Sequence, residues 1–158
     1  MKRILAFVLL LGVDIFSKMV AIQWVPSLLG GAYPFGGIPI VEDFLGISFS
    51  FNYIVNTGAA WGVFAGHSGL LFLARFLIIL ALGAYLFFRK RSAFLWLILT
   101  GAIGNVLDYL LYGHVIDFFH FVFWGYSFPI FNCADAYITL GVLGLILFTK
   151  QERLLPAL

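Results

Sequence analysis

The chain has 158 residues, of which 63% are hydrophobic, 19% aromatic and 10% charged. Soluble domains carry roughly 25% charged residues. A soluble core of this size would leave much apolar surface uncovered, so a lipid bilayer is the better solvent. The net charge of +2 is too small to indicate nucleic-acid binding, and the single cysteine, Cys133, excludes an intrachain disulfide. We expect one membrane-embedded domain, residues 1–158.

Four apolar stretches are long enough to cross a bilayer, which takes about 20 residues. The first follows Lys2 and Arg3, as the apolar part of a signal peptide would. However, Asp14 and Lys18 interrupt it and no small-residue cleavage site follows, so we expect an uncleaved anchor. The sequence predicts a mainly α-helical integral membrane protein with four transmembrane helices, at Ile4–Trp24, Leu70–Phe88, Ala93–Tyr112 and Phe131–Thr149.

Basic residues cluster at alternate ends of these stretches, which predicts their orientation. By the positive-inside rule, both termini and the loop at 89–91 lie in the cytoplasm, whereas residues 25–69 and 113–130 lie outside. Arg75 is the exception, because it lies within the second span, from which we expect its side chain to snorkel outward. The clusters are Lys2 and Arg3; Arg89, Lys90 and Arg91; and Lys150 and Arg153.

The longer outer segment, 25–69, contains a predicted strand. Its first part includes the run L-L-G-G-A-Y-P-F-G-G-I-P, whose glycines and prolines predict an irregular chain. Over 47–55, apolar and polar residues mostly alternate, which is typical of a half-buried strand. We therefore expect a short β-sheet that lies on the outer membrane surface.

Polar residues within the spans fall at helical spacing. In the first span, Asp14 and Lys18 are four residues apart and can form an ion pair, which we interpret as a neutralising structural pair. We expect the four helices to turn their polar faces toward one interior. The polar face of the third span comprises Gly101, Asn105, Asp108 and Tyr112, and that of the fourth comprises Asn132, Asp135 and Thr139. Two pairs of glycines also allow close helix approach, Gly101 with Gly104 and Gly141 with Gly144.

Three aspartates are predicted near the outer surface. Asp108 and Asp135 each lie about one helical turn from the outer end of a span, and Asp117 follows Gly113, which predicts the end of the third helix. Ionisable groups at membrane depth are costly and often functional. Asp117 and Asp135 can form an acid–base pair, or they can be isolated groups that cap helices. Spacing alone leaves both interpretations open.

Other chemistries fit less well. His114, Asp117 and His120 suggest a metal site, but neither a helix nor a strand turns all three to one side, so we expect both histidines at the membrane interface. The run G-H-S-G at 66–69 is similar to the rhomboid protease motif but lacks a histidine base on another span, so Ser68 is predicted to cap the second span. Cys133 is expected to be an inert buried thiol. An ion or proton pathway remains the non-enzymatic alternative, although we find no repeats or broken helices.

Five motifs, in chain order, resemble the bacterial lipoprotein signal peptidase (signal peptidase II) family. The resemblance implies an aspartic endopeptidase of the bacterial inner membrane, active on its periplasmic side, with no cofactor and no metal. Such enzymes remove the signal peptide of prolipoproteins just before a cysteine that carries diacylglyceryl. The motifs are Asp14-I-F-S-Lys18, V-Asn56-T-G-A-A-W-G-V-F, G-A-I-G-Asn105-V-L-Asp108, G-H-V-I-Asp117-F and F-P-I-F-Asn132-C-A-Asp135.

The motif match implies a role for each matched residue. Asp117 and Asp135 become a catalytic dyad, which would share a proton and activate water. One position departs from the family pattern, since Tyr109 stands where arginine is usual. We expect a monomer whose partners are prolipoproteins and membrane lipid. The implied pocket residues are Asn56, Gly58, Asn105, Asp108, Asn132 and Ala134, with Asp14 and Lys18 as structural support. Separately, four aromatic residues suit a belt at the level of the lipid headgroups: Tyr33, Trp61, Trp124 and Tyr126.

Overall fold

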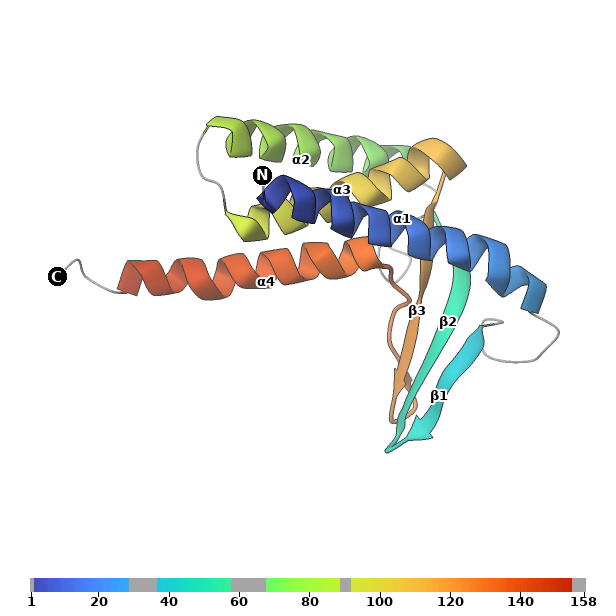
Figure 1. Cartoon of the computed structure of the whole chain (residues 1–158). Helices are drawn as coiled ribbons and strands as arrows, with labels where there is room; N and C mark the ends of the chain where they lie inside the picture. Colours follow the sequence, from blue (N-terminus) through green and yellow to red (C-terminus); the bar gives the residue numbers. More distant parts are fainter. Residues whose placement is uncertain (1, 29–36, 58–67, 89–91, 155–158) are drawn as a thin grey trace.

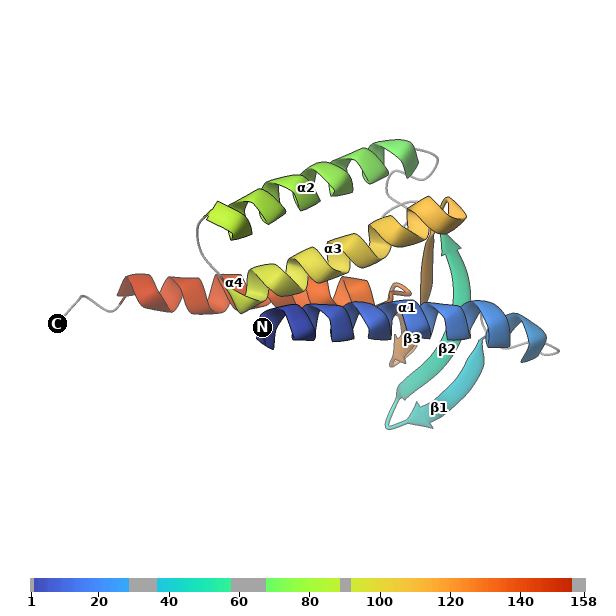
Figure 2. The ribbon, with the colours of Figure 1, turned by 45° about the horizontal axis from the view of Figure 1, so that its top comes forward.

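The computed structural model describes residues 2–28, 37–57, 68–88 and 92–154. The helices lie side by side, and the sheet stands at the end of the bundle where α3 ends and α4 begins (Figures 1 and 2). The elements in chain order are α1 (Lys2–Leu28), β1 (Ile38–Phe44), β2 (Ile47–Asn56), α2 (Ser68–Phe88), α3 (Ala93–Tyr112), β3 (Val115–Phe123), β4 (Tyr126–Ser127) and α4 (Cys133–Leu154).

Within the described part of the chain, three helices are long and apolar enough to cross a membrane, and they cover the first three predicted spans. The apolar part of α4, Cys133–Phe148, is shorter. Large apolar side chains point outward along these helices, and Phe87, for example, is 83% exposed. Such a surface is costly in water but matches lipid tails. The chain is therefore a membrane protein with three long apolar helices and a small antiparallel sheet.

α3 is the central helix, against which α1, α2 and α4 all pack. The predicted close approach of α3 and α4 is confirmed at the glycines. A Cβ atom on Gly101 would overlap the backbone oxygen of Ala134, and one on Gly141 would lie 2.7 Å from the carbonyl oxygen of Phe94. Because only glycine fits at these positions, the first turn of α4 lies directly beside the polar residues of α3.

Gly113 ends α3, as predicted. Its φ of 76° is left-handed, and its N–H donates to the carbonyl oxygen of Tyr109 at 2.9 Å. This turn leads directly into β3, so Asp117 leaves the helix and enters the sheet.

The sheet is antiparallel, with strand order β1-β2-β3-β4. Only β2 matches a predicted strand; β1 and β3 were not predicted from the sequence. Between β2 and β3 the register pairs Phe51 with Phe119 and then Ile54 with Asp117, so an irregularity separates the two pairs. Such bulges bend a strand and re-aim its side chains. Here the irregularity lies immediately before the pair that contains Asp117.

The burial of β2 differs from the usual pattern of a half-buried strand, because its polar residues Ser50 and Asn52 are buried while its aromatic ones are half-buried. His120 on β3 is only 2% exposed, so its expected place at the interface is wrong. Its Nδ1 lies 3.4 Å from the Ser50 hydroxyl and its Nε2 lies 2.8 Å from the Ser127 hydroxyl. Burial lowers the pKa of this imidazole, which therefore stays neutral.

Two tight hairpin turns meet at the far tip of the sheet. Leu45–Gly46 joins β1 to β2 and Trp124–Gly125 joins β3 to β4, and all four residues have positive φ, as two-residue hairpins prefer. The N–H of Trp124 donates to the carbonyl oxygen of Gly46 at 2.7 Å, which locks the tips together. Leu45 and Trp124 are each 78% exposed, so the tip presents apolar side chains outward.

Candidate active site

The two aspartates that the sequence singled out come from different elements. Asp117 lies on β3, and both of its carboxylate oxygens accept a hydrogen bond from an asparagine amide. Asn132 Nδ2 donates to Oδ1 at 2.7 Å, and Asn56 Nδ2, at the end of β2, donates to Oδ2 at 2.7 Å. These two short bonds fix the plane of the Asp117 carboxyl group.

Asp135 lies in the first turn of α4 and takes part in a reciprocal cap. The N–H of Asp135 donates to Asn132 Oδ1 at 2.9 Å, while the backbone N–H of Asn132 donates to Asp135 Oδ2 at 3.3 Å. This is the geometry of a capping box, with aspartate in place of the usual glutamate. The predicted helix cap is therefore present. The same carboxyl group also accepts a hydrogen bond from another helix, α3.

Two asparagines connect the carboxyl groups. Asn105 on α3 donates to Asp135 Oδ1 at 2.8 Å, and its own Oδ1 accepts from Asn132 Nδ2 at 3.1 Å. Asn132 thus contacts Asp117, Asn105 and the backbone of Asp135 at once, and it is fully buried. The structure brings both aspartates into one hydrogen-bond network.

Lys18 forms the buried centre of a second part of this network. Its ammonium nitrogen lies 2.7 Å from carboxylate oxygens of both Asp14 and Asp108, and 3.3 Å from Asn105 Oδ1. All three of its protons therefore have an acceptor. The predicted pair of Asp14 and Lys18 is present, yet it extends across to α3, which the sequence did not indicate.

The same two carboxylates also anchor backbone segments of the site. Asp14 Oδ1 accepts the N–H of Ala134 at 2.8 Å, and Asp108 Oδ2 accepts the N–H of Ile116 at 3.2 Å. The first contact holds the start of α4, and the second holds β3 next to Asp117. Asp14, Lys18 and Asp108 therefore position the segments that carry the two aspartates.

A cavity of about 560 Å³ opens at the carboxyl groups. Its volume lies in the range of binding sites for small molecules and peptide segments. Asp117, Asp135 and Asn56 contribute its polar wall, and apolar residues of α4 and of the segment 128–131 contribute the rest. Arg75 on α2 also lines this cavity, a contact that the sequence did not indicate.

Burial and the nearby charge of Asp135 raise the pKa of Asp117 to about 7. The hydrogen bonds from Asn56 and Asn132 act in the opposite direction, because they stabilise the ionised form. A carboxyl group that changes its charge near neutral pH is suited to proton transfer under physiological conditions.

Other predicted residues have different outcomes. Tyr112 is 42% exposed, so the polar face of α3 ends at Asp108. Tyr109 stacks on Phe72 of α2, with ring centroids 4.9 Å apart. Cys133 is half-buried, with its Sγ 3.5 Å from the Ser17 hydroxyl. The following lie outside the described residues: Gly58, Trp61, Tyr33, His67 and the side chain of Ser68.

The described residues contain no group of three or more His, Cys, Asp or Glu side chains arranged to hold a metal ion. His114 and His120 therefore do not combine with Asp117 in one set of metal ligands. The carboxylate of Asp117 instead accepts hydrogen bonds from side-chain amide groups.

Comparison with known proteins places this chain in a family. The family profile described as signal peptidase (SPase) II matches residues 6–150. A lipoprotein signal peptidase of Chlamydia pneumoniae is 47% identical over 63% of this chain and 62% of its own length. One of Clostridium tetani is 40% identical over 73% of this chain and 75% of its own length.

A solved structure described as a bacterial membrane enzyme has the same fold. Its TM-score is 0.77 at 26% sequence identity, and the match covers 99% of this chain and 93% of the other. The family-profile match and the fold comparison both extend over the segments that carry the two aspartates. The chain therefore belongs to the signal peptidase II family.

Proposed function

We propose that this protein is an aspartic endopeptidase that cleaves diacylglyceryl-modified prolipoproteins just before the lipidated cysteine, with Asp117 and Asp135 as its catalytic dyad. The observation that carries the proposal is the convergence of these two carboxyl groups on one cavity. Asn132 holds both of them, and the cavity has an apolar wall beside its polar one. Family membership supports the peptidase activity, and the geometry supports the choice of residues.

The dyad acts through one shared proton. The ionised carboxylate takes a proton from water as the water oxygen attacks the scissile carbonyl carbon, and the protonated carboxyl group donates to the carbonyl oxygen. As the tetrahedral intermediate collapses, the C–N bond breaks and the leaving nitrogen takes a proton from one carboxyl group. A hydroxyl group of the intermediate returns its proton to the other carboxylate, which restores the dyad. Asn56, Asn105 and Asn132 keep the carboxyl groups oriented throughout.

The site suits a substrate with a lipid tail. The cavity runs from the carboxyl groups along apolar side chains of α4 toward lipid, while the dyad lies at the sheet end of the bundle, within reach of water. α4 has 22 residues and is about 33 Å long, of which the apolar part, Cys133–Phe148, is about 24 Å. A span somewhat shorter than a hydrocarbon core of about 30 Å is accommodated by local thinning of the bilayer. We therefore place four spans in the inner membrane of a bacterium, with both termini cytoplasmic and the sheet periplasmic.

The sheet contributes an interfacial surface. Phe49 stacks on Phe121 with ring centroids 4.6 Å apart, and Phe121 stacks on Phe131, which lines the cavity. This half-buried aromatic face leads to the exposed hairpin tips with Leu45 and Trp124. Aromatic side chains favour the headgroup level of a bilayer, so the sheet would rest on the outer membrane surface as the substrate binds.

The decisive experiment is mass spectrometry of a reaction that contains only purified protein and a synthetic diacylglyceryl-modified precursor. We expect two products whose masses place the cut immediately before the modified cysteine. A precursor without the lipid serves as the control and should be cut far more slowly. No product, or a cut at another bond, contradicts the proposal.

The dyad should lose activity as the pH rises above neutrality. Burial and the charge of Asp135 raise the pKa of Asp117 to about 7, so this carboxyl group loses its proton as the pH rises through neutrality. We expect kcat/KM to fall about tenfold per pH unit above pH 7. A flat profile from pH 6 to pH 9, measured with one precursor in one detergent, would contradict this assignment.

The same pKa also predicts a stability effect. Between the ordinary carboxyl pKa of 3.8 and about 7, the native protein holds a proton that the unfolded chain has released. The stability contributed by Asp117 is therefore complete below pH 3.8 and is lost as the pH rises through about 7. Asp117→Asn removes this dependence, which thermal unfolding in micelles at several pH values measures.

Arg75 is the one cation among the described residues that line the cavity. We expect Arg75→Gln to raise KM about tenfold with a smaller change in kcat, because a charged donor to a substrate carbonyl would be lost. Arg75→Lys keeps the charge and should recover part of the affinity. Equal KM values for all three proteins would exclude a substrate contact.

A further inference from the structure

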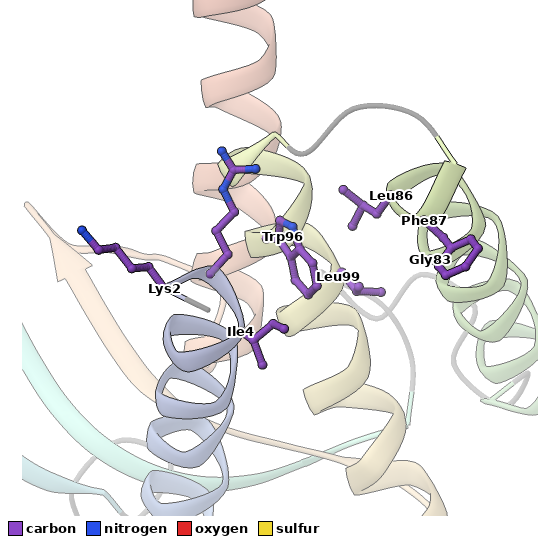
Figure 3. A pocket seen from close by; sticks show the side chains of 8 residues that line it. Lys2, Ile4, Gly83, Leu86, Phe87, Trp96 and Leu99 are labelled. Carbon is purple, nitrogen blue, oxygen red and sulfur yellow. The ribbon is translucent and has the colours of Figure 1, made fainter.

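A second cavity lies at the opposite end of the bundle from the dyad. It measures about 660 Å³ and lies between the start of α1, the end of α2 and the start of α3 (Figure 3). Trp96 lines this cavity, and Asp108 follows it on α3 by about 18 Å of helix. The cavity is therefore separate from the site of the two aspartates.

The wall of this second cavity is apolar on one side and basic on the other. Leu86 and Phe87 of α2 and Leu99 of α3 provide the apolar side, and Phe87 is mostly exposed, so the cavity opens toward lipid. Lys2 and Arg3, at the start of α1, provide two cations. No acidic side chain is among the described residues that line it.

Two further groups favour an anion here. The indole Nε1 of Trp96 is buried and has no hydrogen-bond partner among the described residues. An unpaired buried N–H costs free energy, which a ligand that accepts its hydrogen bond recovers. The start of α3 also lacks a side-chain cap at Ser92, so the positive end of that helix dipole is not neutralised by its own cap.

We propose that this second cavity binds the headgroup of an anionic phospholipid, with Lys2 and Arg3 as the cations for the phosphate and the ring of Trp96 in the cavity wall beside it. The apolar side along α2 takes the first part of the acyl chains. Basic pockets between transmembrane helices are suited to such lipids, because the charge lies at headgroup level and the tails remain in the bilayer. An occupant that joins α1 to α2 would also fill a gap between two helices that both pack on α3.

Quenching of Trp96 fluorescence by brominated lipid tests this proposal. Trp24, Trp61 and Trp124 are replaced by phenylalanine, and the protein is placed in phosphatidylcholine nanodiscs. Brominated phosphatidylglycerol is then compared with brominated phosphatidylcholine at equal mole fractions. We expect phosphatidylglycerol to quench with at least a fivefold higher apparent affinity, since each cation near the surface contributes about fivefold. Equal quenching by the two lipids would overturn the proposal.

Lys2→Gln combined with Arg3→Gln should bring the ratio of affinities close to one. Because these residues also affect membrane orientation, a second variant blocks the cavity without changing charge. A Cβ atom added at Gly83, which lines the cavity, would have no atom within 4 Å, so there is room for Gly83→Leu to extend its side chain into the cavity. It should reduce the preference for phosphatidylglycerol at least threefold, by excluding the headgroup from the cations.

Gly12→Leu is the matched control. It lies on α1, also has no atom within 4 Å of a new Cβ and does not line the cavity, so the lipid preference should remain. Preference that survives in Gly83→Leu, or that is lost equally in Gly12→Leu, would contradict the proposed site. If added inorganic phosphate abolishes the difference in quenching affinity between the two lipids, a free anion occupies the cavity. That result would overturn the lipid assignment.

Discussion

Asp117→Asn and Asp135→Asn are each expected to lower the rate of precursor cleavage at least about a thousandfold. An asparagine can neither take a proton from water nor carry the shared proton, and acid–base catalysis of this kind contributes roughly 10²–10⁴-fold for each group. The double variant should be no slower than either single one, because the two carboxyl groups act as a unit. Mass spectrometry of the purified reaction measures all three rates.

The fold should survive these changes. Asparagine has nearly the shape of aspartate but only one acceptor oxygen, so each substitution leaves one N–H group without its acceptor, at a cost of about 1–3 kcal/mol. Asp43→Asn is the matched control, since Asp43 is exposed on β1 with a left-handed φ of 46° that asparagine tolerates. This variant should keep full activity. Substantial cleavage by Asp117→Asn or Asp135→Asn, with unchanged thermal unfolding, would refute the dyad.

Lys18→Met should have the largest effect on stability. Lys18 is 2% exposed and neutralises Asp14 and Asp108, so its removal leaves two carboxylates buried without a counter-charge. Breaking a buried ion pair in this way costs about 3–5 kcal/mol. SDS titration in mixed micelles measures the loss. Activity should fall as well, because Asp14 and Asp108 hold the backbones that precede Asp135 and Asp117.

Two comparisons separate charge from volume at this position. Gln23→Met removes an exposed polar side chain of the same helix and should change stability by less than about 0.5 kcal/mol. Adding Asp14→Asn and Asp108→Asn to Lys18→Met removes the unpaired charges but keeps oxygens that accept the N–H groups of Ala134 and Ile116. This triple variant should recover most of the loss. No recovery would show that shape, not charge, governs the site.

The helices could be predicted closely because membrane spans depend on local composition. About 20 apolar residues and a terminal glycine define α3, and the structure has it from Ala93 to Tyr112 with Gly113 as its cap. The sheet was harder to predict from the sequence. β3 reads V-I-D-F-F-H-F-V-F, a nearly continuous apolar run without period-two alternation, so pattern alone does not distinguish it from buried helix.

The site could be predicted where it depends on spacing within one element. Asn105 and Asp108 lie on one face of α3, and Asn132 and Asp135 lie close together at the start of α4. The two groups meet in the structure, where Asn105 is hydrogen-bonded to both Asp135 and Asn132. The contacts of Lys18 with Asp108 and of Arg75 with the cavity join separate helices, and no periodicity contains that information. His120 was misplaced for the same reason, since its partners Ser50 and Ser127 follow from strand register.

The hydrogen bond between Asp14 and Ala134 has a consequence for the order of assembly. Its two residues are 120 positions apart, so at about 5–20 residues per second a ribosome takes roughly 6–24 s to supply the partner. Lys18 is made almost together with Asp14, and its ion pair forms within one helix turn. α1 therefore enters the membrane with this ion pair already formed and without net charge at that depth, and the hydrogen bond to Ala134 can form only after α4 has been made.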